Sequence, residues 1–434
     1  MTSKFLTVII SLFIAGSLQA SPKIEHWQTS NGANVYFVAA PELPMVDLEV
    51  VFDAGSARDG DLSGTALLTN AMLNEGAAGL NTNEIAAEFE NVGAQFSNSS
   101  ERDMTVFSMR SLTADFALKP ALATFTKVLT QPDFPASSFE RMQKQMLIGL
   151  QAEKQSPAAI ASRAFYTNLY GKHPYAGMPS GDEASVQKIN IAALKAFYKQ
   201  YYVAKNATVV LVGALNTQQA KDIAEQVLKG LPAGNKASPV AHVDEMISAQ
   251  NIVIQYPSSQ THIVMGQPGA SRHDPDYFAL YVGNHILGGS GLVSQLSNEI
   301  REKRGLSYSV YSFFRPMRES GPYQFGLQTR NDQAKEALDV MQKTLNDFIS
   351  KGPSEAELTA AKQNITGGFA LRVDSNNKIA DYTAMIGFYG LPLDYLENFN
   401  AKINAVTIEQ IKDAFARRVH PDKMVTILVG GQTE

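Results

Sequence analysis

The sequence predicts an α+β protein made of two duplicated domains, each a mostly antiparallel sheet with helices packed on one face. Three observations lead to this fold class: the length of the chain, a long-range internal repeat, and strand and helix patterns mixed within each half. The chain has 434 residues, of which 44% are hydrophobic, and contains no cysteine. Such a chain can bury a large core, so we expect its stability to come from burial rather than from disulfides.

A weak repeat with a spacing near 218 residues divides the chain into two similar halves. Four residues recur in the same order: Pro135, Lys144, Gln145 and Phe197 recur as Pro353, Lys362, Gln363 and Phe415. Each half then closes with a similar apolar run, at residues 209–213 and 425–430, where the match slips by one residue. A spacing this long indicates two duplicated domains rather than a solenoid.

The boundary between the halves is expected in a small, polar stretch punctuated by Pro and Gly, from Gly230 to Pro239. We therefore predict an N-terminal domain at residues 21–229, a linker at residues 230–244 and a C-terminal domain at residues 245–434.

Local patterns place strands and helices in both halves. A strand with one solvent-exposed face is expected where apolar residues alternate with acids: Val46, Leu48, Val50 and Phe52 alternate with Asp47 and Glu49. A helix is expected to begin at Ser354, because Ser354 and Glu357 after Pro353 form a capping-box pattern.

The first twenty residues have the features of a signal peptide. Lys4 is followed by an apolar run from Phe5 to Ala15, and the small residue Ala20 provides a cleavage site. A membrane anchor is the competing interpretation, but the apolar run is shorter than the roughly 20 residues that cross a bilayer. We expect cleavage after Ala20, no stable membrane anchor, and a periplasmic or secreted protein.

The charge balance excludes one class of partner. The net charge is -5, and no cluster of Lys and Arg forms the basic patch that nucleic acid requires. We expect no nucleic-acid partner.

Motifs in both halves resemble the pitrilysin/insulinase family of zinc peptidases, which includes the mitochondrial processing peptidases. The first half carries Gly55–Asp59, Ser63-Gly64, Glu90–Phe96 and Asp103–Val106. The second half carries Leu287–Gly289, Ser294–Leu296 and the more specific run Glu299–Tyr311. The resemblance covers essentially the whole mature chain. It implies the same duplicated α+β domains, forming half of a clam-shell.

The zinc motif of that family is missing from this chain. Active members carry His-x-x-Glu-His on the helix after the Ser-Gly pair, with both imidazoles on zinc and the Glu as general base. The resemblance aligns Leu67–Ala71 with this motif. Leu67 and Ala71 offer a metal no lone pair, and the amide of Asn70 cannot take a proton from water. The third ligand, a Glu, aligns with Ile148-Gly149. We expect no metal or cofactor in this chain and zinc in a partner subunit.

No other histidine cluster replaces the motif, because no two histidines have the four-residue spacing of a helical zinc site. One distributed set is clustered in sequence: His262, His273, Asp274, Asp276 and His285. Polar loop residues explain this set better than a metal site does. His173, in the run Gly171–Tyr175, matches a turn of the family, and we expect it to be structural.

The resemblance also implies a contribution from the second half, where the family carries an Arg and a Tyr seven residues apart that reach a zinc site in the opposite half. Arg301 and Tyr308 match this spacing. A guanidinium there binds substrate carbonyls, and a phenol donates to the developing oxyanion. The competing interpretation pairs Arg301 with Glu299 or Glu302 and makes Tyr308 a half-buried strand residue.

The residues around this pair predict their local structure. Leu292, Leu296 and Ile300 mark the buried stripe of a short helix that Ser290 caps, and Gly305 supplies its left-handed end. Residues 308–314 are expected to form a strand. The glycines at 288–291 fit neither a nucleotide-binding loop nor a serine-hydrolase frame.

The leading hypothesis is a non-catalytic subunit that pairs with a zinc-bearing subunit of the same family and helps it cleave peptides. Arg301 and Tyr308 would be its catalytic contribution. The alternative is a peptide-binding or scaffold protein with no role in catalysis. A third possibility, an independently active metallopeptidase, conflicts with the missing ligands.

Overall fold

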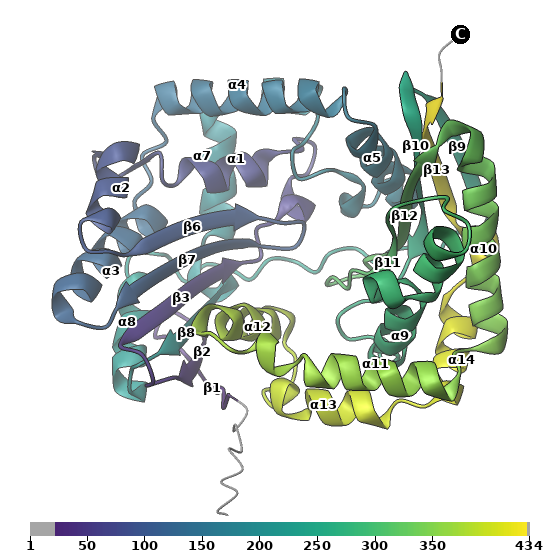
Figure 1. The fold of residues 1–434 in the computed structure, drawn as a ribbon. Coiled ribbons are helices and arrows are strands. Elements are labelled where there is room, and N and C mark those ends of the chain that lie inside the picture. Colours follow the sequence, from purple (N-terminus) through teal and green to yellow (C-terminus); the bar gives the residue numbers. More distant parts are fainter. Residues whose placement is uncertain (1–21, 432–434) are drawn as a thin grey trace, which may run out of the picture.

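The computed structural model describes residues 22–431, and the predicted signal peptide at residues 1–20 lies outside the described residues. Two sheets face different directions in Figure 1, the first on the left and the second on the right. No helix of residues 22–431 combines the length and the apolar character needed to cross a membrane.

The first sheet has six strands, in the spatial order β1-β2-β8-β3-β7-β6. Their bounds are β1 (Glu25–Gln28), β2 (Asn34–Ala39), β3 (Met45–Phe52), β6 (Gln95–Ser100), β7 (Thr105–Leu112) and β8 (Ala207–Gly213). Every neighbouring pair is antiparallel except β2 and β8. A separate small hairpin joins β4 (Gly76–Ala77) to β5 (Leu80–Asn81).

The second sheet has five strands, in the order β11-β12-β10-β13-β9. Their bounds are β9 (Gln250–Gln255), β10 (Ser258–Pro268), β11 (Val310–Phe314), β12 (Pro322–Arg330) and β13 (Val425–Gly431). Only β9 and β13 pair in parallel. The predicted α+β class with mostly antiparallel sheets is confirmed.

The helices of the two halves follow the same plan. The first half contains α1 (Thr65–Met72), α2 (Thr82–Glu90), α3 (Asp115–Thr130), α4 (Ala136–Glu153), α5 (Pro157–Tyr170), α6 (Glu183–Lys188), α7 (Ile191–Tyr201) and α8 (Thr217–Val227). The second contains α9 (Tyr277–Asn284), α10 (Ala334–Lys351), α11 (Glu355–Gly367), α12 (Asn376–Tyr389), α13 (Tyr395–Ala405) and α14 (Ile408–Arg418).

The repeated residues lie in corresponding elements. Lys144 lies in α4 and Lys362 in α11, while Phe197 lies in α7 and Phe415 in α14. Each half then closes with its strand, β8 or β13. The capping box at the start of α11 is also confirmed, because the Ser354 hydroxyl accepts from the backbone N–H of Glu357. The segment between α8 and β9, which includes the expected linker at residues 230–244, forms no helix or strand.

The two halves exchange one helix each. Helix α12 of the second half packs on β8, β3 and β2 of the first sheet, and α5 of the first half packs on β10 and β13 of the second. In Figure 1, α12 lies against the first sheet and α5 against the second, while α4 runs along the top of the first half and α11 along the bottom of the second. Because α12 buries Val51, Val210 and Val212 with its own Ile379 and Ala380, the first sheet is covered on both faces.

This exchange corrects one prediction. The strand expected at residues 46–52 is present as β3, but its acidic face is not exposed to solvent, because Asp47 and Glu49 are both buried. Asp47 is held by Arg110 on β7, whose Nε donates to it over 2.9 Å. Glu49 faces Asp381 on α12. The alternation in the sequence indicated the strand correctly, but it could not show which helix covers it.

A buried carboxylate joins the halves at their junction. Asp103, in the turn between β6 and β7, accepts hydrogen bonds from the Tyr175 hydroxyl at 2.5 Å and the Tyr389 hydroxyl at 3.0 Å. It also accepts from the backbone N–H of Arg318 at 2.7 Å. Tyr389 and Arg318 belong to the second half, so one acid of the first half fixes two segments of the other.

Candidate functional site

Helix α1 carries the residues that align with the zinc motif. Its first turn is anchored by Asp59, whose carboxylate accepts from the backbone N–H groups of Gly64 and Ala66, both at 2.7 Å. Leu67 and Ala71, one turn apart, are both partly exposed, whereas Leu68 between them is fully buried. The geometry of a two-ligand helix face is therefore present, but its side chains are hydrocarbon and cannot coordinate a metal.

Asn70, at the position of the general base, is buried and hydrogen-bonded. The Asn98 amide on β6 donates to the backbone oxygen of Asn70 at 2.8 Å and to its Oδ1 at 3.0 Å. An amide has no basic lone pair to accept a proton at neutral pH, and this one is already used as an acceptor. Asn70 therefore ties α1 to the edge strand of the sheet.

The remaining ligand position gives no oxygen donor either. Ile148 is exposed on α4 beside Gly149, and neither has a ligating side chain. Within residues 22–431, no group of three or more His, Cys, Asp or Glu side chains is arranged to hold a metal ion.

In the set His262, His273, Asp274, Asp276 and His285, the two acids form ion pairs with arginines. Asp274 pairs with Arg418 at 2.8 Å, and Asp276 pairs with Arg417 at 2.8 Å. Hydrogen bonds from Arg417 hold the pKa of Asp276 below its usual range. His273 Nε2 lies 2.6 Å from the backbone oxygen of Tyr389. These contacts give His273, Asp274 and Asp276 structural roles, but the set is not one of loop residues throughout, because His262 lies in β10 and His285 begins the π-helical turn η4 (His285–Gly289).

His173 has the structural role expected of it. Its Nδ1 accepts from the backbone N–H of Tyr175 at 3.1 Å, and its Nε2 lies 2.8 Å from the backbone oxygen of Ala241. The turn therefore holds the segment that leads to the second half.

The helix that carries Arg301 differs in part from its prediction. Leu296 and Ile300 are buried as expected, but Leu292 is 63% exposed and lies in a separate short turn, η5 (Gly291–Val293). The prediction that Ser290 caps the helix is wrong: the Ser294 hydroxyl accepts from the backbone N–H of Ser297 instead. The glycines at 288–291 let the chain turn twice, so the helix starts later than its apolar spacing suggests. Residues 297–302 then form a wide π-helical turn, η6 (Ser297–Glu302).

Gly305 ends this helix as predicted. Its φ of +63° lies in the left-handed region that favours glycine. Its N–H donates to the backbone oxygen of Arg301 at 2.9 Å, and the N–H of Leu306 donates to that of Ile300 at 2.9 Å. These two bonds satisfy the last carbonyls and turn the chain toward β11.

Tyr308 is not the half-buried strand residue of the competing interpretation. It is 90% exposed and precedes β11, which begins at Val310 rather than at residue 308. The strand starts late because Ser307 accepts from the backbone N–H of Ser309 and donates to the backbone oxygen of Gln328. This local turn leaves the phenol in solvent.

Arg301 is the least constrained cation of its helix. Its Nε lies 3.6 Å from a carboxylate oxygen of Glu302, beyond hydrogen-bonding distance. Its neighbours Lys303 and Arg304 both hold Glu299, at 2.5 and 2.8 Å, and these bonds, that of Lys303 foremost, keep the pKa of Glu299 low. Arg301 and Tyr308 thus lie on either side of the same glycine turn, the first weakly paired and the second exposed.

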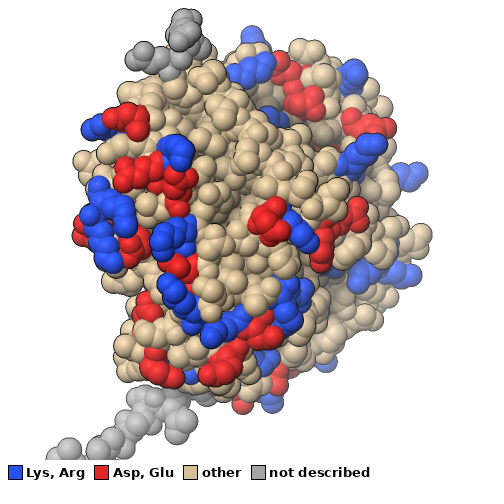
Figure 2. All heavy atoms as spheres, turned by 90° about the vertical axis from the view of Figure 1, so that its right-hand side faces the viewer, with Lys and Arg blue, Asp and Glu red and all other residues tan. Residues whose placement is uncertain are grey.

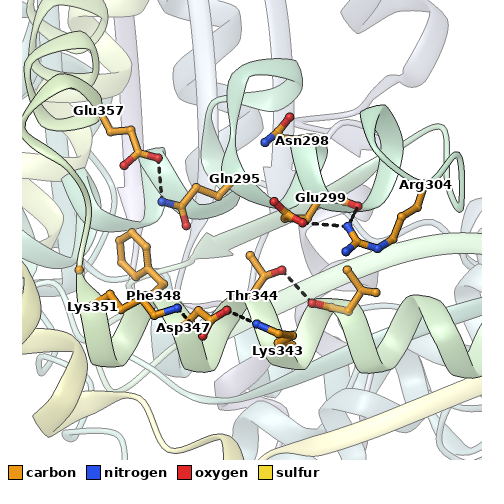
Figure 3. Close-up of a pocket in the computed structure, with 12 residues that line it drawn as sticks. Gln295, Asn298, Glu299, Arg304, Lys343, Thr344, Asp347, Phe348, Lys351 and Glu357 are labelled. Carbon is orange, nitrogen blue, oxygen red and sulfur yellow. Dashed lines mark hydrogen bonds and ion pairs between the residues drawn. The ribbon is translucent and has the colours of Figure 1, made fainter.

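A cavity of about 390 Å³ lies beside this helix, against α10, and does not include the pair. Figure 3 shows that its polar groups bond to one another: Gln295 to Glu357, Arg304 to Glu299, and Lys343 to Asp347. Since each charge already has a partner, this cavity offers little to a charged ligand. Figure 2 shows Lys and Arg interspersed with Asp and Glu over the visible face, with no region of one sign.

Sequence reasoning did not single out the free edge of the first sheet. β6 ends the strand order, and its residues alternate between exposed and partly buried. Its sequence, QFSNSS, carries no charge and only one large apolar residue, so the usual alternation signal is weak. β6 packs beside α1, and its unpaired backbone groups therefore lie next to the degenerate zinc motif.

Two family models match the chain. The model described as Insulinase (Peptidase family M16) matches residues 35–180, and the model described as Peptidase M16 inactive domain matches residues 188–365. A crystal structure of a peptidase M16 inactive domain from Pseudomonas fluorescens is 43% identical, with a TM-score of 0.92 over 94% of this chain and 98% of that chain.

Two curated relatives are more distant. The non-peptidase homolog YmxG of Helicobacter pylori is 26% identical over 422 residues, covering 94% of each chain. The uncharacterized zinc protease YmxG of Bacillus subtilis is 21% identical over 411 residues, covering 94% of this chain and 98% of the relative. One relative is thus described as a peptidase and the other as not.

Proposed function

Because the chain belongs to peptidase family M16 as a member without the zinc-binding residues, we propose that it is a non-catalytic subunit that assists a zinc-bearing subunit. It binds peptide substrates and supplies Arg301 and Tyr308 to the partner's site. The zinc is held by the partner. The signal-peptide pattern at residues 1–20 supports the same activity in the periplasm or outside the cell.

The observation that carries this proposal is that Tyr308 is exposed to solvent and Arg301 is only weakly paired. An aromatic side chain at 90% exposure gains nothing from the fold, and an arginine that lies 3.6 Å from its only acid contributes little stability. Lys303 and Arg304 show that the same helix can engage its cations in close pairs. The guanidinium of Arg301 and the phenol of Tyr308 therefore remain available to bind a substrate or a partner subunit.

The free edge of β6 supports the peptide-binding part. An extended peptide can add to such an edge through backbone hydrogen bonds, whatever its side chains. The exposed Gln95, Ser97 and Ser99 present no charge, so they repel neither acidic nor basic segments. Asn98 fixes the edge to α1 and keeps it in place for a substrate strand.

The test mixes the purified chain with a zinc-bearing M16 subunit from the same organism and measures hydrolysis of a quenched fluorescent peptide. We expect activity from the mixture that neither protein has alone. Arg301→Ala with Tyr308→Phe should lower kcat/KM about 100-fold, because losing one oxyanion donor typically costs about 3 kcal/mol. The matched control is Arg304→Ala with Tyr311→Phe, which changes a closely paired Arg and a 40% exposed Tyr that lies within β11.

Four results oppose the proposal. If the zinc-bearing subunit is fully active alone, or if both double variants behave alike, the chain has no catalytic role. Peptide binding without any such partner would favour the scaffold alternative. Stoichiometric zinc in the isolated chain, measured by atomic absorption, would instead indicate an independent metallopeptidase.

A further inference from the structure

The outer edge of the second sheet is β9, and its unpaired backbone groups can be identified. The N–H of Gln250 donates to Met424 and that of Tyr256 donates to Gly430, both on the side of β13. Residues of even number therefore face β13, and Asn251, Val253 and Gln255 direct their N–H and C=O groups outward. Among the hydrogen bonds of residues 22–431, none involves these outward groups.

This edge lacks the features that keep exposed strands apart. Natural edge strands are usually protected by a Lys, a Pro or a bulge. The β9 sequence, QNIVIQ, has no charge and no proline, and its pairing with β13 runs without a bulge. Val253 at its centre is 62% exposed. A strand of this kind readily pairs with another strand.

The strand is complementary to a second copy of itself. In an antiparallel pairing centred on Val253, each Val253 faces the other, Ile252 faces Ile254, and Asn251 faces Gln255. Amides then meet amides and aliphatic side chains meet aliphatic side chains. Because Val253 directs its backbone groups outward, the two Val253 residues form a hydrogen-bonded pair in this register.

The pairing of aliphatic side chains continues on the face of β9 that is directed toward α5. Ile254 lines a largely apolar cavity of about 530 Å³ together with Ile160 and Ala164 of α5. In the register centred on Val253, Ile252 of the second copy lies against Ile254, at the side of this cavity. The second strand thus adds apolar contact to its backbone hydrogen bonds.

We propose that two copies of this chain associate edge to edge through β9, forming one continuous sheet of ten strands, five from each copy. The contact is isologous, with a twofold axis at Val253. A six-residue ribbon is smaller than a standard interface, so its dissociation constant should be roughly micromolar. The proposal does not depend on the assistance to a zinc-bearing subunit, which uses other surfaces.

Sedimentation of the full chain over a range of concentrations measures the association. We expect a monomer–dimer equilibrium that Val253→Lys weakens at least tenfold, because two ammonium groups would then meet at the axis. Val253→Pro should act similarly, since the N–H that it removes points outward. The control Phe116→Lys, at an exposed apolar position on α3, should leave the equilibrium unchanged. Circular dichroism checks that each variant is folded.

Crosslinking tests the register. The chain has no cysteine, so a single introduced thiol reports one position. Directly facing residues of a hydrogen-bonded pair lie about 5.5 Å apart at Cα, within the range of a disulfide. Val253→Cys should therefore form a dimer under mild oxidation, and Ile252→Cys, which faces Ile254, should not. A monomer at all concentrations, or equal crosslinking of both variants, overturns the proposal.

Discussion

The amide of Asn98 on β6 donates to both oxygens of Asn70 on α1, at 2.8 and 3.0 Å. At a position that the resemblance aligns with the family's catalytic base, this contact links α1 to the free edge of the first sheet. The edge and the helix are therefore held in a fixed relation without any metal.

Removing this link should destabilise the protein measurably. Asn98→Ala removes the donor that the side-chain oxygen of Asn70 accepts from, and its backbone oxygen keeps only the N–H of Leu73 at 3.3 Å. We expect a loss of about 1–2 kcal/mol in the free energy of unfolding. Urea denaturation monitored by circular dichroism measures it. Ser99→Ala, at the next and exposed position of β6, should stay within about 0.5 kcal/mol of the parent. Equal effects of the two changes would contradict this role of Asn98.

The helix face at Leu67 and Ala71 should accept a metal once ligands are supplied. Leu67→His with Ala71→His places two imidazoles one turn apart on a partly exposed face, a spacing that suits zinc. We expect zinc to stabilise this variant, by about 2.7 kcal/mol when its concentration is a hundred times the dissociation constant. Thermal unfolding with and without zinc tests this.

The matched control for the zinc variant has the same spacing on the buried side. Leu68→His with Met72→His changes two fully buried residues, so it should unfold more easily and gain nothing from zinc. If the two double variants respond alike to zinc, the exposed face of α1 has no ligand geometry.

The acid pair between β3 and α12 should make stability depend on pH. Burial, and then repulsion by Asp381, raises the pKa of Glu49, and burial also raises the pKa of Asp381. Arg110, on the neighbouring strand β7, is bound to Asp47. The folded state therefore keeps a proton that the unfolded chain releases, so stability is full below the ordinary pKa of a glutamic acid. This stability is lost as the pH rises through the raised pKa of Glu49.

Glu49→Gln removes this titration. We expect its free energy of unfolding to match the parent near pH 4 and to exceed it by on the order of 2 kcal/mol at pH 9. Glu42→Gln, an exposed acid in the loop before β3, is the control and should follow the parent throughout. A parallel decline of the parent and Glu49→Gln would show that the pair does not cause the pH dependence.

Asp103 should be the most sensitive single residue of the junction. Asp103→Ala removes the acceptor of two tyrosines and a backbone N–H, and we expect a loss of roughly 3 kcal/mol or more. Glu101→Ala breaks an exposed pair with Arg315 and should cost less than about 1 kcal/mol. Chemical denaturation distinguishes the two; a small effect at Asp103 would show that other contacts hold the junction.

Short-range signals predicted structure well in this chain. Ser354 with Glu357 and Gly305 act through hydrogen bonds to their own neighbours, so their effects could be read from adjacent residues. The repeat predicted the duplicated fold because each match marks an equivalent element. The absence of zinc ligands at Leu67 and Ala71 was equally visible from the aligned motif.

Long-range packing was the part that the sequence could not supply. Asp47 and Glu49 alternate with apolar residues like the exposed face of a strand, yet a helix from the other half covers them. Leu292 has the right spacing for the buried stripe but is separated from the helix by glycine turns. Neither the exchange of α5 and α12 nor the outward side of β9 has a local sequence signature.

The helix exchange also determines when the first half can finish folding. Strand β8 ends at Gly213, but the helix that covers Val51, Val210 and Val212 begins only at Asn376, roughly 160 residues later. During synthesis, the first sheet therefore keeps an open apolar face until nearly the whole chain is available. The halves are duplicates in plan, but they cannot mature one after the other, and a chain truncated before α12 should behave as an aggregation-prone intermediate rather than as a domain.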